Sequence, residues 1–218
     1  MGTKMNNYEK TKENIRPRFL EYDQEEMIEK FHLDHNEKDL FVDFTGNRYK
    51  ICRKTGKIEK EIMKPEGMAF CGVSYEEALS IYDMLCYSTK NVEQKGGWCL
   101  VNSLPGTGQN SGVGDNARTK ENKLIDEHPR EFEEVCKELG GEKICWGDIG
   151  YEIPVFPFFS VRIRFYHSDE EFASSFSLYF RENTLEFIHY ETTYYIADCL
   201  LGEIKKRMEV RLEKEMEN

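Results

Sequence analysis

Two segments in the last third of the chain, residues 161–166 and 172–180, constrain the fold more than any other part of the sequence. Both alternate apolar with polar side chains. The apolar positions are Val161, Ile163, Phe165, Phe172, Phe176, Leu178 and Phe180, and the polar positions are Arg162, Arg164, Tyr166, Ser175, Ser177 and Tyr179. A period of two places alternate side chains on opposite faces of a strand. With the polar residues 167–171 as their connection, the segments predict an antiparallel hairpin whose apolar face, including Phe172, enters the core.

The remaining patterns predict an α+β fold. Residues 3–36 have helical character, with a break at Pro17 and an N-cap at Asp23. Three short strands with intervening turns follow between residues 40 and 62, and Ser74 with Glu77 forms a capping box before a helix. Later elements are a short strand at residues 97–101, a helix that starts at Pro129, and a long C-terminal helix.

We therefore expect a single α+β domain, with an antiparallel sheet built from the N-terminal meander and the C-terminal hairpin and packed by helices. Within residues 1–218, a helical extension covers 1–24, the core covers 25–207 and a charged tail covers 208–218.

The net charge of −11 argues against nucleic-acid binding, which requires a clustered basic surface that the sequence lacks. No apolar run approaches the roughly 18 residues of a membrane span, and no secretory signal is visible, so we expect a cytoplasmic protein without a membrane partner. The seven cysteines form no C-x-x-C pair and are interpreted as reduced thiols.

Four carboxylates are the first candidate site: Asp148, Asp169, Glu170 and Glu171. Brought together by folding, they could hold a hard cation or perform acid–base chemistry. The alternative is that residues 169–171 form a solvated hairpin turn.

Arginine and aromatic side chains are the second candidate. Arg162 and Arg164 share one strand face, with Tyr179 on the neighbouring strand, and two guanidinium groups suit a carboxylate or phosphate. Trp98 is a candidate pocket wall that could stack against a flat ligand. An ordinary solvated sheet face is the alternative.

Two further motifs lack the elements that a cofactor site needs. The glycine-rich residues 103–118 do not contain the Gly-Lys of a phosphate-binding loop, which leaves a surface loop or a lid. His32 and His35 could share one side of a helix, but two ligands do not make a zinc site. The sequence therefore predicts no metal and indicates no particular cofactor.

The order of several motifs resembles a known family. They are Gly147-Asp148-Ile149-Gly150-Tyr151-Glu152-Ile153-Pro154, Phe156-Pro157, Asp169-Glu170-Glu171-Phe172 and Leu178-Tyr179-Phe180. Together they resemble the prokaryotic family called domain of unknown function 3786, over roughly residues 25–207. Arg181 stands where the family pattern leads us to expect an aspartate.

The resemblance implies a link to proteins of anaerobes, some of which join this domain to iron–sulfur modules near one-carbon or corrinoid metabolism. Because no complete catalytic arrangement is visible, we expect a non-enzymatic ligand-binding or accessory domain with an unidentified small-molecule or protein partner. The alternatives are an enzyme that uses the four carboxylates, and a protein–protein adaptor that uses the C-terminal helix.

Overall fold

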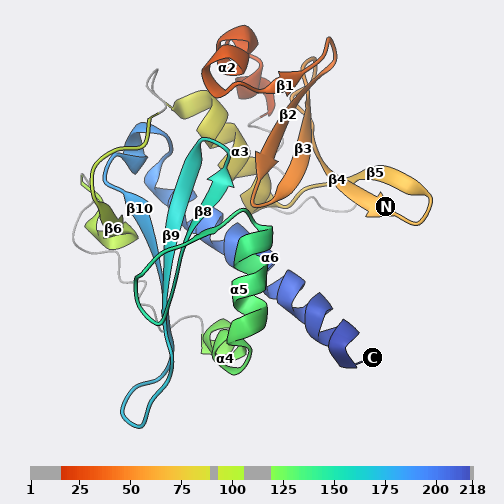
Figure 1. Cartoon of the computed structure of the whole chain (residues 1–218). Helices are drawn as coiled ribbons and strands as arrows, with labels where there is room; N and C mark the ends of the chain where they lie inside the picture. The colour runs from red at the N-terminus through yellow and green to blue at the C-terminus, as the bar shows by residue number, and fades with distance from the viewer. Residues whose placement is uncertain (1–15, 89–92, 106–118, 217–218) are drawn as a thin grey trace, which may run out of the picture. The chain divides into compact units, whose positions relative to one another are not determined.

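The computed structural model describes residues 16–88, 93–105 and 119–216. These residues form helices and two five-stranded antiparallel sheets, so the predicted α+β class is confirmed (Figure 1). The meander and the hairpin lie in different sheets, because each recruits further strands of its own rather than pairing with the other.

The chain divides into two compact units, each of which contains one sheet. Unit 1 consists of Met1–Glu93 and Glu186–Ile196, and unit 2 consists of Gln94–Leu185 and Ala197–Asn218. The prediction that the whole chain is one domain stays a prediction, for which limited proteolysis is a direct test.

The sheet of unit 1 is a meander in which every strand pairs with the next along the chain. Its strands are β1 (Asp34–His35), β2 (Asp39–Phe44), β3 (Asn47–Cys52), β4 (Ile58–Lys64) and β5 (Gly67–Cys71). Thr45 and Gly46, with φ angles of 47° and 69°, form the tight β2–β3 turn. The sequence predicted three strands. It missed the two-residue β1 and the half-buried β5, which carry little apolar alternation.

Two helices of unit 1 start at the predicted caps. Asp23 Oδ1 accepts hydrogen bonds from the backbone nitrogens of Glu25 (2.9 Å) and Glu26 (3.2 Å) at the start of α2 (Gln24–Phe31). Ser74 and Glu77 form the complete capping box of α3 (Tyr75–Tyr87).

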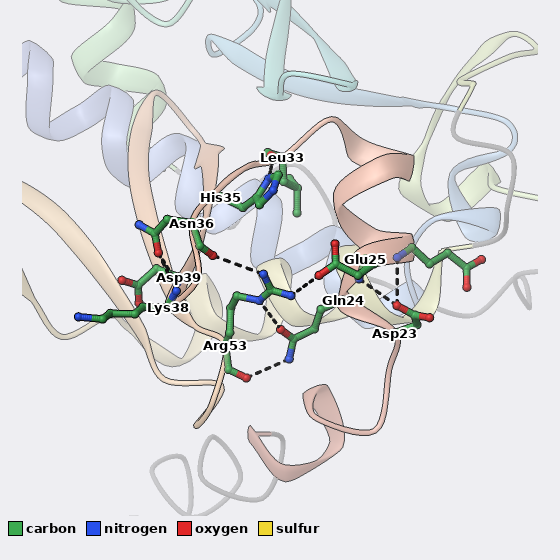
Figure 2. Close-up of polar contacts among 10 residues, drawn as sticks. Asp23, Gln24, Glu25, Leu33, His35, Asn36, Lys38, Asp39 and Arg53 are labelled. Atoms are coloured by element: carbon green, nitrogen blue, oxygen red, sulfur yellow. Dashed lines mark hydrogen bonds and ion pairs between the residues drawn. The ribbon is translucent and has the colours of Figure 1, made fainter.

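Arg53 attaches α2 to the meander (Figure 2). Its Nε donates to Gln24 Oε1 (3.1 Å), its carbonyl accepts from Gln24 Nε2 (3.0 Å), and its guanidinium pairs with Glu25. This reciprocal contact fixes the first turn of α2 against the end of β3.

The predicted helix over residues 3–36 is wrong at its C-terminal end, and residues 1–15 lie outside the described residues. Residues 16–19 are helical, so the chain turns after residue 19 rather than at Pro17. The helix α2 ends at Phe31, where His32 adopts a left-handed φ of 51°, and residues 34–35 pair with β2 instead. His35 Nδ1 lies 3.2 Å from the carbonyl oxygen of Leu33 (Figure 2). Because both histidines come after the last residue of α2, they do not share a helix face.

The sheet of unit 2 has the strand order β6-β10-β9-β8-β7. The strands are β6 (Trp98–Leu100), β7 (Glu142–Lys143), β8 (Ile149–Phe156), β9 (Phe159–Tyr166) and β10 (Ser175–Arg181). The predicted hairpin is confirmed as β9 and β10, and Val161, Ile163 and Phe165 are fully buried. Phe132 of α5 (Pro129–Glu138) packs against Phe165 on this face, with ring centroids 6.2 Å apart.

Phe172 is a correction, because this predicted core residue is 69% exposed and precedes the second strand. Asp169 Oδ1 accepts from the backbone nitrogens of Glu171 (2.8 Å) and Phe172 (2.7 Å), and the Asp169 nitrogen donates to the Phe172 carbonyl (2.9 Å). This closed turn uses the backbone groups of Phe172 before the ladder begins at Ser175.

The C-terminal helix α6 (Tyr190–Met216) begins in unit 1 and continues in unit 2, and it includes most of the predicted charged tail. None of the helices in the described part of the chain is both long and apolar enough to cross a membrane. All seven cysteines are free thiols.

Candidate functional site

The face of the unit 2 sheet opposite α5 carries arginine and aromatic side chains. The strand register places Arg162 beside Glu152 of β8 and Tyr179 of β10, and Arg181 beside Trp98 of β6. We call this surface the arginine face, which comprises Trp98, Trp146, Glu152, Arg162, Arg164, Tyr179 and Arg181.

Trp98 is in contact with two guanidinium groups. The guanidinium carbons of Arg162 and Arg181 lie 4.5 Å and 4.1 Å from the centroid of its ring. Arg162 Nε also donates to Glu152 Oε2 at 2.8 Å, and the Nη1 of Arg181 donates to the Gly96 carbonyl at 2.8 Å. Stacking and hydrogen bonding together hold these two planar groups in defined orientations.

Arg164 lies among three further aromatic rings. Its guanidinium carbon is 5.0 Å from the ring of Tyr179, 5.2 Å from that of Tyr166 and 5.4 Å from that of Trp146. Trp146 and Tyr179 touch each other, with centroids 4.3 Å apart. The aromatic rings therefore lie around the guanidinium group of Arg164 and restrict its orientation.

Two glycines allow Trp146 to reach this position. Gly147 has a φ of 73°, and a Cβ there would lie 2.7 Å from Arg164 Cγ and 2.8 Å from the Phe165 carbonyl oxygen. A Cβ on Gly150 would lie 2.5 Å from the carbonyl oxygen of Trp146. The Gly-Asp-Ile-Gly motif thus encodes a turn that only glycine can close so tightly against β9.

The arginine face has more positive than negative charge. Glu152 pairs with Arg162, whereas Arg164 and Arg181 have no carboxylate partner within residues 16–88, 93–105 and 119–216. The Nε of Arg164 and the Nε1 of Trp98 are buried and lack an acceptor among those same residues. Arg164 and Arg181 therefore carry guanidinium groups that no carboxylate of the described residues neutralises, and such groups suit an anion.

Two of the four predicted carboxylates, Asp148 and Asp169, accept hydrogen bonds from backbone nitrogens. Asp148 Oδ2 accepts from the backbone nitrogen of His167 (2.8 Å), while its own nitrogen donates to the Phe165 carbonyl (3.0 Å). Hydrogen bonds from the backbone of Glu171 and Phe172 lower the pKa of Asp169. These two aspartates organise the start and the turn of the β9–β10 connection.

The side chains of Glu170 and Glu171 are exposed and have no polar partner in the described ranges. The described residues also contain no group of three or more His, Cys, Asp or Glu side chains arranged to hold a metal. Residues 106–118, most of the glycine-rich loop, lie outside the described residues.

Sequence reasoning missed three members of the arginine face: Trp146, Glu152 and Arg181. Trp146 directly precedes the Gly147-Asp148 motif, which could have drawn attention to it. Nothing in the local sequence shows that the Trp146 ring turns back onto β9. Arg181 stands at the position where we expected an aspartate, and it lies over Trp98 instead. Glu152 alternates with buried residues on β8, so its pairing with Arg162 follows only once the register is known.

Reasoning from sequence also missed a histidine–carboxylate pair at the end of β9. Asp126 of α4 (Thr119–Glu127) lies with Oδ1 2.7 Å from His167 Nδ1, and its Oδ2 accepts from Ser168 Oγ at 2.5 Å. Burial acts to raise the pKa of Asp126, but the hydrogen bonds from Ser168 and His167 outweigh it and keep the pKa below its ordinary value.

Comparisons with known proteins identify a family for most of the chain. A family model described as Domain of unknown function (DUF3786) matches residues 23–203, close to the predicted extent of 25–207. Neither the curated proteins nor the solved structures include a match. The matched segment contains the whole arginine face. Because the family model covers well over half of the sequence, the chain belongs to the DUF3786 family.

Proposed function

We propose that this DUF3786 chain is a ligand-binding domain whose arginine face binds the carboxylate or phosphate group of a small metabolite. The observation that carries the proposal is the excess of guanidinium groups on one surface of a protein whose net charge is −11. Buried arginines are usually paired, whereas the half-buried Arg164 and Arg181 have no carboxylate partner among the described residues.

The aromatic rings support this role in two ways. They hold the guanidinium planes in place before a ligand arrives, which lowers the entropy cost of binding. They also reduce the local dielectric constant, which strengthens charge-assisted hydrogen bonds to an anion. A ligand with a conjugated ring would gain further contact area against Trp98 or Trp146.

The narrower assignment, to anaerobic one-carbon or corrinoid-associated metabolism in the cytoplasm, is suggested only by the family resemblance and stays a prediction. Gel filtration tests this assignment. Hydroxocobalamin is mixed with the protein, and co-elution of the two would support a corrinoid ligand.

Intrinsic fluorescence gives a selective test, because the chain has two tryptophans and both belong to the arginine face. Pyrophosphate, citrate and flavin mononucleotide are titrated into the full chain, with riboflavin as the phosphate-free partner of the flavin. We expect saturable fluorescence changes with at least one anion, and weaker binding of riboflavin than of its phosphate.

Arg164→Gln should weaken anion binding about tenfold, the order expected for loss of a charge-assisted hydrogen bond. The matched control is Arg130→Gln on the exposed side of α5, which should titrate like the unmodified chain. Equal affinities for all three proteins, or no response to any anion, would refute the proposal.

A further inference from the structure

Unit 1 contains a cavity of about 400 Å³ whose lining residues all belong to that unit. Its volume falls within the range of roughly 300–1,000 Å³ that is usual for small-molecule sites. The walls are largely aromatic, with contributions from Phe19, Tyr22, Tyr82, Tyr87 and Tyr195. Such walls suit a small, flat and mostly apolar molecule.

A histidine–aspartate pair lies at this cavity. Asp83 of α3 lies with Oδ1 2.5 Å from His189 Nδ1, and its Oδ2 accepts from the His189 backbone nitrogen (2.7 Å) and Thr192 Oγ1 (2.5 Å). The carboxylate is therefore fixed at three points at the start of α6. It is 14% exposed, whereas the imidazole is 55% exposed.

This geometry determines which nitrogen of His189 is available. A carboxylate beside Nδ1 favours the tautomer with hydrogen on Nδ1, which leaves Nε2 as the acceptor. The ring is held by Tyr87, whose centroid is 3.7 Å away. Asp83 would also stabilise the imidazolium that forms if Nε2 takes a proton.

Two other groups at the cavity are poor candidates for proton exchange near neutral pH. Burial raises the pKa of the Cys86 thiol to about 12, and it raises the pKa of Tyr82 to about 12 as well. The hydroxyl of Tyr82 already donates a hydrogen bond to the Gly56 carbonyl oxygen at 2.5 Å. The fixed charges at the wall, besides Asp83, are Arg18 and Glu191.

We infer that this cavity binds a small phenol-like molecule and that His189 Nε2 accepts the proton of its hydroxyl group. In that step the O–H bond breaks and an N–H bond forms at Nε2, giving a phenolate and an imidazolium that is paired with Asp83. Nothing in this inference depends on the arginine face.

The probe for the experiment is para-nitrophenol, whose phenolate has its own visible absorption band. Titrations use the full chain at about pH 7, above the ordinary imidazole pKa near 6.5 and close to the pH at which free para-nitrophenol ionises. The absorption change is measured against the free probe at the same pH. Nitrobenzene, which lacks the hydroxyl group, is the matched ligand. We expect saturable binding of para-nitrophenol with growth of the phenolate band.

The first variant is His189→Gln, which keeps the backbone nitrogen and Thr192 as donors to Asp83 and so keeps the start of α6 intact. It should bind para-nitrophenol about tenfold more weakly and without the phenolate band, as expected when a charge-assisted hydrogen bond is lost. His35→Gln, an exposed histidine on β1, is the matched control and should behave like the unmodified chain.

A second variant, Leu79→Trp, fills the cavity while leaving His189 in place, and it should bind neither probe. Circular dichroism of each variant checks that the fold is retained. An unchanged para-nitrophenol spectrum with the unmodified chain, or equal titrations for it and His189→Gln, would overturn the inference.

Discussion

Each unit contains one histidine–aspartate pair of nearly the same design. In unit 1, Asp83 contacts His189 Nδ1 with one oxygen and the hydroxyl of Thr192 with the other. In unit 2, Asp126 contacts His167 Nδ1 with one oxygen and the hydroxyl of Ser168 with the other. A half-buried carboxylate thus orients an imidazole in both units, and a hydroxyl fixes the carboxylate.

The two pairs differ in what lies behind the imidazole. His167 meets the fully buried ring of Phe165 edge-on, with centroids 5.4 Å apart. His189 lies against Tyr87, which is 44% exposed and lines the 400 Å³ cavity. A similar polar arrangement therefore lies against a core ring in unit 2 and beside a ligand-sized cavity in unit 1.

The largest expected effect concerns the core behind His167. Phe165→Ala should lower the free energy of unfolding by about 3 to 5 kcal/mol, because it leaves a cavity between α5 and β9. Urea unfolding measures the loss. Phe172→Ala is the matched control, since that side chain is 69% exposed, and it should change stability by less than about 0.5 kcal/mol. Similar losses for both variants would contradict the buried role of Phe165.

The next largest effect is the pH dependence that Asp126 gives to the free energy of unfolding. Its folded pKa lies below the ordinary carboxyl value, so its contribution is present above about pH 4 and is lost as the pH falls through the lowered folded pKa. Asp126→Asn should therefore lower the free energy of unfolding by about 1 to 2 kcal/mol at neutral pH. The gap in stability between the variant and the unmodified chain should become smaller as the pH falls. Urea unfolding at several pH values measures this.

The control for that pH series is His167→Gln, which keeps Asp126 and its hydrogen bonds from Ser168. This variant should retain the acid-side loss of stability seen in the unmodified chain. If the free energies of unfolding of Asp126→Asn and the unmodified chain differed by the same amount at every pH, the assigned role of the carboxylate would be contradicted.

The smallest effect on stability is expected at the ring behind His189. Tyr87→Ala should cost less than about 1 kcal/mol, because the side chain is half-exposed, yet it should weaken para-nitrophenol binding measurably. Tyr166→Ala, which removes a ring of nearly the same exposure from unit 2, should leave that binding unchanged. If Tyr87→Ala destabilised the chain as strongly as Phe165→Ala, the contrast between the two pairs would fail.

Local patterns predicted the parts of the fold whose interactions are close in sequence. Asp23 and Ser74 start helices because their partners lie two or three residues away. The alternation in β9 predicted which side chains are buried, whereas in β10 Ser177 and Tyr179, which were predicted on the polar face, are buried as well. Prediction failed where a few hydrogen bonds override the pattern, as in the turn at Asp169 that exposes Phe172.

Prediction of the candidate sites followed the same division. Arg162, Arg164 and Tyr179 were identifiable because they share one strand face by periodicity alone. Trp146 was not, since its ring reaches Arg164 only through the backward turn at Gly147. The pair of Asp83 and His189 was out of reach, because the partners are separated by 106 residues.

The sequence by itself determined the α+β class, the apolar face of the hairpin, the capped helix starts and the family, because these depend on residue spacing within one element. The tertiary structure alone decided which polar groups meet. It gave Arg164 and Arg181 aromatic neighbours but no carboxylate among the described residues, and it joined Asp83 to His189 beside a cavity. Hydrogen bonds and stacking act over a few ångströms in space, and their partners here come from elements that are distant along the chain.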